Sequence, residues 1–236
     1  MKICSDCVRH CGVQRPDTLH GEGVFGFCRC PRNPVVARAA LHRWEEPCIS
    51  GTRGSGTVFF SGCNLRCVFC QNYEISSGLQ GREITVGRLR GIYGELIAQG
   101  AHNINLVTPG HYTEAILESL KEPLPVPVVY NSNGYDDLEQ LRRLEGKIQI
   151  YLPDFKYAGN TLAERYSHAP DYFETASAAI QEMFRQCGPY VIGGDGMMKS
   201  GVIVRHLLLP GQLAEAKRIV RYLYHTYGNH IYISLM

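Results

Sequence analysis

Short apolar runs alternate with stretches of helical periodicity along most of this chain, from about residue 57 onward. Six of the runs are four to eight residues long and are bounded by polar or glycine-containing segments, which is typical of buried strands. Five amphipathic stretches fill the intervals between these runs and predict helices. The predicted strands are 57–60, 104–108, 126–132, 148–155, 202–209 and 231–236, and the predicted helices are 86–100, 113–121, 135–146, 172–188 and 213–228.

This alternation predicts an α/β fold with a parallel sheet. Right-handed crossovers between successive strands then give a partial (βα)6 TIM-type barrel. Residues 1 to about 35 are rich in Cys, Gly, Pro and Arg and show little periodicity. We therefore expect two parts: a small Cys-rich N-terminal metal-binding segment with its connector at 1–50, and the barrel domain at 51–236.

The composition narrows the class of protein. The chain has 236 residues, of which 44% are hydrophobic, enough for one large core. With 24 basic and 22 acidic residues the net charge is +2, which gives no reason to expect a nucleic-acid partner. The N-terminus is polar and no apolar run approaches membrane-spanning length, so we expect a cytoplasmic protein without a membrane partner. Ten cysteines in such a chain indicate metal binding or redox catalysis before disulfides.

Polar segments follow five of the predicted strands. Because the carboxyl ends of parallel strands meet at one edge of a sheet, we expect these segments to form a single site. They are SGCNLRCVFCQN (61–72), TPGHY (108–112), NSNGYD (131–136), PDFKY (153–157) and RHLLLPG (205–211).

The first of these segments carries three cysteines, Cys63, Cys67 and Cys70. Thiolates are soft ligands that suit zinc and iron–sulfur clusters, and a four-iron cluster normally takes four of them. Three thiolates on one loop leave one iron open to a substrate or cofactor. The alternatives are three reduced thiols or part of a zinc site.

The spacing of these cysteines, with Phe69 in the aromatic position before the last one, resembles the radical S-adenosylmethionine (SAM) superfamily. FFSGCNLRCVFCQN, VYNSNGY, PDFKY and RHLLLPG, in this order, are similar to segments of the pyruvate formate-lyase activating enzyme group, the activases of glycyl radical enzymes. The resemblance implies an oxidoreductase with a [4Fe-4S] cluster on the three cysteines. It also implies reductive cleavage of SAM to a 5′-deoxyadenosyl radical that abstracts a hydrogen atom.

The resemblance also implies contacts to SAM from Phe69, Asn72, Thr108, Gly110, Asn133, Asp154, Lys156 and His206. Lys156 and His206 are expected to donate to its carboxylate or ribose. Many relatives carry a Gly-Gly-Glu-like segment where this chain has Thr-Pro-Gly-His-Tyr, so backbone carbonyls of Thr108 or Gly110 are expected to accept the ammonium. The alternatives are an Asp154–Lys156 salt bridge, a core His206, and an ordinary turn at Asn133.

His111 lies in the same Thr-Pro-Gly-His-Tyr segment and is a candidate proton donor or substrate contact. Trp44, Glu45 and Glu46 lie in the connector that precedes the barrel domain. They are expected to form a surface packing strap, with a lid over the barrel as the alternative.

The expected partners and substrate are implied by the resemblance alone. It implies an electron donor such as flavodoxin or ferredoxin and, as hydrogen donor, a glycyl residue of a partner enzyme. Another protein or peptide, or a small molecule, is the alternative substrate. A non-catalytic iron–sulfur or zinc protein is the alternative class.

A second group of cysteines lies near the N-terminus. Cys4, Cys7, Cys11 and Cys28 are predicted to bind a structural zinc ion or a second four-iron cluster, with Cys30 as the competitor of Cys28. Unligated thiols in a mobile tail are the alternative. The two remaining cysteines, Cys48 and Cys187, are predicted to be structural.

Overall fold

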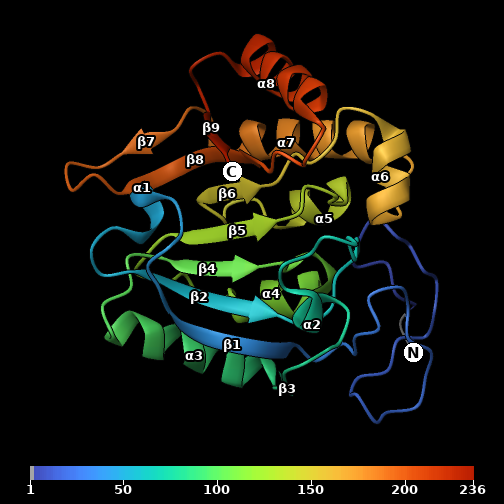
Figure 1. Ribbon diagram of the computed structural model, residues 1–236. Coiled ribbons are helices and arrows are strands. Elements are labelled where there is room, and N and C mark those ends of the chain that lie inside the picture. Colours follow the sequence, from blue (N-terminus) through green and yellow to red (C-terminus); the bar gives the residue numbers. More distant parts are fainter. Residues whose placement is uncertain (1–2) are drawn as a thin grey trace.

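The computed structural model describes residues 3–236 and shows a mixed α/β fold around one sheet of nine strands (Figure 1). The strands are β1 (Val35–His42), β2 (Ser55–Phe60), β3 (Arg82–Glu83), β4 (Ile104–Val107), β5 (Val128–Ser132), β6 (Ile150–Pro153), β7 (Val191–Ile192), β8 (Met198–His206) and β9 (Tyr232–Leu235). The α-helices are α1 (Pro47–Ser50), α2 (Tyr73–Ser76), α3 (Val86–Ala98), α4 (Thr113–Ser119), α5 (Leu138–Arg143), α6 (Asn160–Ser167), α7 (Tyr172–Cys187) and α8 (Leu213–Tyr227).

Six strands, β2, β4, β5, β6, β8 and β9, are neighbours in chain order, and each pair of them is parallel. Their carboxyl ends therefore lie along one edge, at the arrowheads in Figure 1. Strands β1 and β3 extend the sheet beyond β2, and the sheet is not closed.

The positions of the six predicted strands and five predicted helices are confirmed. The predicted helix 135–146 is shorter in the structure, because Asp137 caps the first turn of α5 by accepting a hydrogen bond from the Gln140 backbone N–H. Short elements α1, α2, β3 and β7 and the eight-residue α6 were not predicted.

Strand β1 was not predicted either. It pairs antiparallel with β2, from Val36 opposite Phe60 to His42 opposite Ser55. Several of its side chains are exposed or half-buried, as its place towards the edge of the sheet requires. The predicted division at residue 50 thus falls between two paired strands, and two separate domains remain a prediction.

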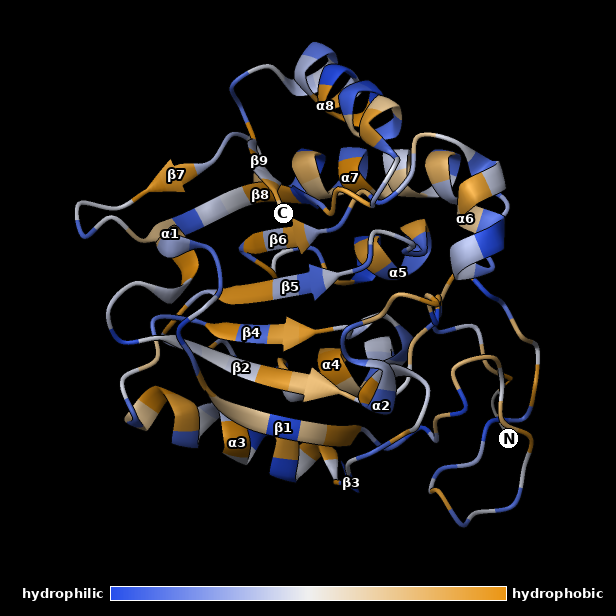
Figure 2. Cartoon of the chain, viewed as in Figure 1, coloured by the Kyte–Doolittle hydropathy of each residue, from blue (hydrophilic) through white to orange (hydrophobic). Residues whose placement is uncertain are grey.

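The core lies between the sheet and the helices that cover one of its faces. Every residue of β5 and β6 is buried, and Tyr93, Tyr151 and Tyr172 are among the largest fully buried side chains. Figure 2 shows β5 passing from hydrophobic to hydrophilic towards its arrowhead, so polar groups concentrate at its carboxyl end.

Residues 3–34 form a coil at the same end of the sheet as the arrowheads (Figure 1). No helix within residues 3–236 combines the length and the apolar character needed to cross a membrane. The Cys-rich coil therefore lies beside the edge where the polar segments gather.

Candidate functional site

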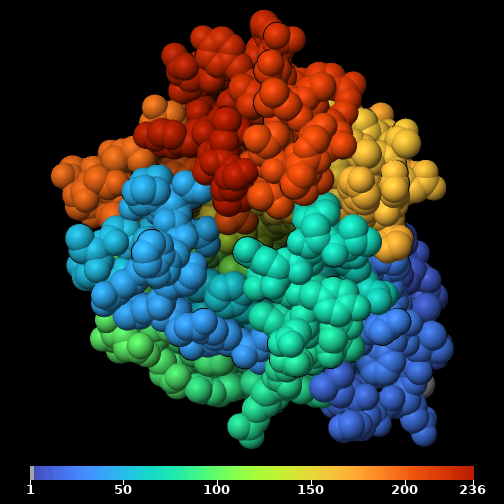
Figure 3. All heavy atoms as spheres, viewed as in Figure 1, coloured from blue at the N-terminus to red at the C-terminus, as the bar shows by residue number. Residues whose placement is uncertain are grey.

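A cavity of about 400 Å³ lies at the carboxyl ends of the six parallel strands. Figure 3 shows it as a recess between the segment that contains α2 and the C-terminal residues. Its lining includes Phe59, Phe60, Cys63, Cys67, Phe69, Cys70, Asn72, Val107, Thr108, Asn131, Ser132, Asn133, Asp154, Lys156, Arg205, Leu207 and Met236.

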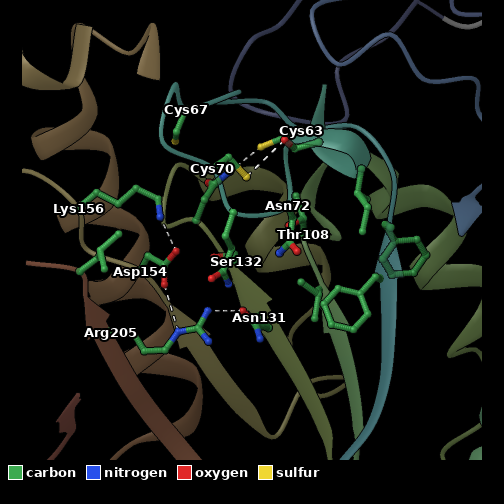
Figure 4. Close-up of a pocket in the computed structure, with 18 of the residues that line it drawn as sticks. Cys63, Cys67, Cys70, Asn72, Thr108, Asn131, Ser132, Asp154, Lys156 and Arg205 are labelled. Atoms are coloured by element: carbon green, nitrogen blue, oxygen red, sulfur yellow. Dashed lines mark hydrogen bonds and ion pairs between the residues drawn. The ribbon is translucent and has the colours of Figure 1, made fainter. Parts of the chain in front are cut away.

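Nine of the predicted site residues line this cavity together. They are Cys63, Cys67, Phe69, Cys70, Asn72, Thr108, Asn133, Asp154 and Lys156. In Figure 4 the three cysteines lie at one end of the cavity and Asp154 and Arg205 at the other. The structure thus brings residues separated by up to 93 positions, from Cys63 to Lys156, to one place.

The cysteine loop begins at Gly62, directly after β2. Gly62 has a φ of +82°, and a Cβ atom there would lie 2.1 Å from the Cys30 sulfur. Only glycine fits, both because of the backbone conformation and because of this contact. Burial raises the pKa of the Cys67 thiol to about 11 and also raises the pKa of Cys63. Thiolate ligands at these positions therefore require a compensating positive charge.

Three charged groups form a chain along the cavity. Lys156 Nζ lies 2.5 Å from Asp154 Oδ2, and Arg205 Nε lies 3.1 Å from Asp154 Oδ1. Although burial acts to raise it, Lys156 and Arg205 together hold the pKa of Asp154 below its ordinary value. Burial acts to lower the pKa of Lys156, but Asp154 and Cys67 raise it, so the ammonium stays charged. The Asp154–Lys156 salt bridge, which the sequence offered as the alternative to contacts with SAM, is present, and both residues line the cavity.

Glu45 lies next to Arg205, at the end of this series of charged groups that is farthest from Lys156. Its Oε1 accepts a hydrogen bond of 2.8 Å from Arg205, and its Oε2 accepts bonds from Asn105 (2.9 Å) and Asn131 (3.1 Å). Arg205 also donates to Asn131 Oδ1 at 2.6 Å. The expectation of a surface position for Glu45 was wrong, since its side chain is only 10% exposed. The neighbouring Trp44 is 90% exposed.

Within the Thr108–Tyr112 segment, some residues line the cavity and others lie in the core. Thr108 lines the cavity and has a φ of +58°, whereas Gly110 packs against Asp136 and Tyr130. His111 is buried, and its Nε2 lies 2.8 Å from the Ser61 carbonyl oxygen. Burial and the nearby Arg15 lower the pKa of His111 to about 3. A neutral, buried His111 does not reach the cavity lining.

His206 also lies outside the first cavity. Its Nδ1 donates to the Phe155 carbonyl oxygen at 2.8 Å, and burial lowers the pKa of the imidazole. It lines a second cavity of about 460 Å³ beside α8 with Leu208, Leu213 and Lys217. The strand places His206 on the face opposite to Arg205.

The N-terminal cysteines gather behind the cysteine loop. Cys4, Cys7 and Cys28 are buried, and Cys11 accepts a hydrogen bond of 3.3 Å from the Phe27 N–H. Cys30 is fully buried, and its thiol donates towards the carbonyls of Cys28 and Ser61. Within residues 3–236, no three His, Cys, Asp or Glu side chains converge closely enough to hold one metal ion.

Two arginines connect this coil to the cavity loops. Arg9 donates to the carbonyls of Asn64 (2.7 Å) and His168 (2.6 Å). Arg15, with only 5% of its surface exposed, donates to the carbonyls of Cys30 (2.7 Å) and His111 (2.6 Å), while its Nη2 has no hydrogen-bond partner within the described residues. No pattern in the sequence indicated either set of contacts.

The chain is similar in sequence to an uncharacterized archaeal protein. No family model matches the chain. It is 31% identical over 223 residues to the uncharacterized protein MJ0674 of Methanocaldococcus jannaschii, an alignment that covers 90% of this chain and 58% of that protein. The chain thus spans less than two thirds of this relative.

Two solved structures are similar to part of this chain. Methylornithine synthase (PylB) matches with a TM-score of 0.49 and 14% identity, over 76% of this chain and 52% of that one. The glycoside hydrolase domain of PelA from Pseudomonas aeruginosa matches with a TM-score of 0.43 and 13% identity, over 78% of this chain and 79% of that one. Neither similarity assigns a function to this chain.

Proposed function

We propose that this chain is a radical SAM enzyme whose Cys63, Cys67 and Cys70 bind a [4Fe-4S] cluster with one open iron. The observation that carries the proposal is the shared cavity: three thiols from one loop and the polar groups of Asn133, Asp154 and Lys156 line it together. A metal store has no use for such groups beside its thiols. The fold that accompanies this function is a partial TIM-type barrel, with which the six parallel strands in chain order are compatible.

The donor set fits a cluster. The three thiols are soft ligands, and they do not converge on one point. In a cluster each thiolate binds a different iron, so convergence is not needed. When bound and reduced, the cluster supplies the electron that cleaves SAM and so generates a 5′-deoxyadenosyl radical.

The polar groups of the cavity orient SAM. Lys156 keeps its charge and presents an ammonium to the methionine carboxylate, while one of its three hydrogens stays on Asp154. The backbone carbonyl of Thr108 accepts from the methionine ammonium. Asn133 lines the cavity beside the thiols. Its Nδ2 donates to Cys63 and Asn64, so its Oδ1, which accepts from the Tyr135 N–H, offers its second lone pair to the same end of the cofactor. Apolar side chains such as Phe60 and Leu207 restrict the access of water.

Anaerobic reconstitution tests this proposal. The protein is loaded with iron and sulfide, reduced in the presence of SAM, and analysed by chromatography for 5′-deoxyadenosine. The wild type should form this product and Cys67→Ala should not. A Cys67→Ala variant that cleaves SAM at the wild-type rate would contradict the cluster assignment. A wild type that binds iron but never cleaves SAM would favour a non-catalytic iron–sulfur protein.

The substrate and partners are the finer part of the proposal. The resemblance of the motifs to glycyl radical enzyme activases supports a glycyl residue of a partner enzyme as hydrogen donor, and a flavodoxin or ferredoxin as cytoplasmic electron donor. A peptide or a small molecule is the competing substrate. Deuterium transfer from a specifically labelled candidate into 5′-deoxyadenosine distinguishes them, because only the true hydrogen donor passes its label on.

A second metal site at the N-terminus is part of the same proposal. Cys4, Cys7, Cys11 and Cys28 are the ligands, since the Cys30 thiol directs its one hydrogen at the carbonyls of Ser61 and Cys28 instead. The buried Nη2 of Arg15, without a hydrogen-bond partner in the described residues, supports a negatively charged group at this place.

Elemental analysis tests the second site. A Cys63/Cys67/Cys70 triple-Ala variant, purified without oxygen, should retain iron with sulfide, or else zinc. A variant without any metal would rule out an independent N-terminal site.

A further inference from the structure

Each thiol of the cysteine loop has its own side-chain hydrogen-bond donor, and the three donors come from different parts of the fold. The Asn133 amide, after β5, donates to the Cys63 sulfur at 3.4 Å. The hydroxyl of Ser76, at the end of α2, donates to the Cys70 sulfur at 3.4 Å. The third donor is the Ser167 hydroxyl at the end of α6, which lies 2.9 Å from the Cys67 sulfur.

The Ser167 contact differs from the other two. It is shorter by 0.5 Å than either of them, and Ser167 is fully buried, so water does not compete for its hydroxyl. Tyr157, whose hydroxyl lies 2.6 Å from the Ser167 oxygen, is buried as well. The Ser167 hydroxyl has one hydrogen and donates it to the Cys67 sulfur, so the Tyr157 hydroxyl must donate to the Ser167 oxygen. A chain Tyr157→Ser167→Cys67 results, in which each hydrogen bond polarises the next.

Hydrogen bonds to ligand sulfurs help to set the reduction potential of an iron–sulfur cluster. Reduction adds an electron whose charge is shared with the thiolates, so a donor at sulfur stabilises the reduced state more than the oxidised one. Removing the donor therefore makes the cluster harder to reduce. Donors of unequal strength also make the three ligated irons inequivalent.

We propose that Ser167, supported by Tyr157, is the main residue that raises the reduction potential of the cluster on this loop, with Ser76 as a weaker contributor. This inference rests on the proposed function only in requiring a cluster on Cys63, Cys67 and Cys70. Ser167 and Tyr157 do not line the cavity and act through Cys67. They are positioning residues.

Arg9 holds the donor in place. Its guanidinium, which also bonds to the Asn64 and His168 carbonyls, donates to the Ser167 carbonyl at 3.4 Å. The cysteine loop and the end of α6 are therefore tied together by one side chain. The Ser167 hydroxyl and the Cys67 sulfur belong to the two segments that Arg9 joins.

The test is an anaerobic redox titration of reconstituted protein without SAM, followed by the electron paramagnetic resonance signal of the reduced cluster. Ser167→Ala should lower the equilibrium constant for reduction by about tenfold, a shift of about 59 mV for one electron. Tyr157→Phe and Ser76→Ala should shift the potential in the same direction by less. Ser119→Ala is the matched control, because it removes a buried serine hydroxyl on α4 that bonds to Tyr93 instead.

Iron and sulfide contents are measured in every variant, which separates a changed potential from a lost cluster. An unchanged potential in Ser167→Ala with full iron content overturns the inference. If Ser167→Ala fails to hold a cluster, Tyr157→Phe decides, and an unchanged potential there overturns it equally. A wild-type cluster that never cleaves SAM contradicts the proposed function but leaves this titration valid. A wild type that binds no cluster overturns both.

Discussion

The guanidinium of Arg9 donates its Nε hydrogen to the carbonyl oxygen of Asn64 at 2.7 Å, so a residue of the N-terminal coil fixes the cysteine loop directly. The same side chain stacks on Phe27, with its central carbon 4.2 Å from the ring centroid. The Cys-rich coil therefore supports the cysteine loop, whether or not the coil itself binds a metal.

Arg9→Ala should lower the free energy of unfolding by about 2 kcal/mol, since hydrogen bonds from a charged donor are lost and the three carbonyls of Asn64, Ser167 and His168 are left without it. It should also reduce the iron retained after reconstitution, because Asn64, whose carbonyl Arg9 holds, directly follows Cys63 in the cysteine loop. Chemical denaturation and iron analysis measure the two effects. Arg43→Ala, which removes an exposed arginine, is the control. Equal losses in the two variants would show that Arg9 has no special role.

Lys156→Ala removes the charged donor proposed to bind the methionine carboxylate. Truncation of such a donor typically costs ~1.5–3 kcal/mol, so SAM should bind roughly ten- to a hundredfold more weakly. Asp154 keeps its bond to Arg205 in this variant, which limits damage to the fold. Calorimetry on reconstituted protein measures the affinity, with Lys199→Ala, an exposed lysine on β8, as control. Unchanged affinity in Lys156→Ala would place the carboxylate elsewhere.

Asp136 gives the protein a defined pH dependence. It accepts hydrogen bonds from Ser132 (2.5 Å) and Tyr130 (2.9 Å), and burial raises its pKa from 3.8 to about 6. The folded protein therefore binds this proton more tightly than the unfolded chain. The resulting stabilisation is fully present below about pH 4 and is lost as the pH rises through 6, by up to about 3 kcal/mol.

Asp136→Asn does not titrate, so its stability relative to wild type should increase between pH 4 and pH 7. Urea denaturation at the two pH values measures this difference. Glu118→Gln, at an exposed acidic residue of α4, should show no such trend. A pH-independent difference between Asp136→Asn and wild type would argue against a titrating Asp136.

Glu45→Gln should destabilise the protein, because the substitution leaves the Arg205 cation with one buried carboxylate partner instead of two. Removal of one partner of a buried pair typically costs about 3–5 kcal/mol. Because Asp154 remains as a partner of Arg205, we expect the free energy of unfolding to fall by at most about 3 kcal/mol. Denaturant midpoints compare this variant with Glu118→Gln, at an exposed acidic residue of α4. Similar midpoints for both variants and wild type would mean that the Glu45 contacts contribute nothing.

The periodicity of the sequence was sufficient for the six parallel strands and their helices, because each has a clear hydrophobic pattern of its own. Strand β1 was missed because VVARAALH has neither a continuous apolar run nor clean alternation. Its place in the sheet depends on pairing with β2, which no local pattern reveals.

The site could be predicted where motif and strand geometry agree. Asp154 and Lys156 are two positions apart and face the same cavity. Arg205 and His206 are adjacent at the end of β8, so they face opposite sides, and Arg205 is the one in the cavity. Strand alternation was the signal that would have identified Arg205. The sequence marked Glu45 as part of a strap or lid, but no local pattern indicated its contact with Arg205, which lies 160 residues away.

One consequence of the Glu45 contacts concerns the shape of the sheet. Its single carboxylate touches Asn105 on β4, Asn131 on β5 and Arg205 on β8. Between β4 and β8 lie β5 and β6, so a flat sheet would separate the outer two by about 14 Å at the usual strand spacing. Side chains from all three strands nevertheless reach this one group. The Glu45 carboxylate, on a segment outside the six parallel strands, thus holds β4, β5 and β8 at a fixed spacing, and any slippage between these strands would break at least one of its contacts.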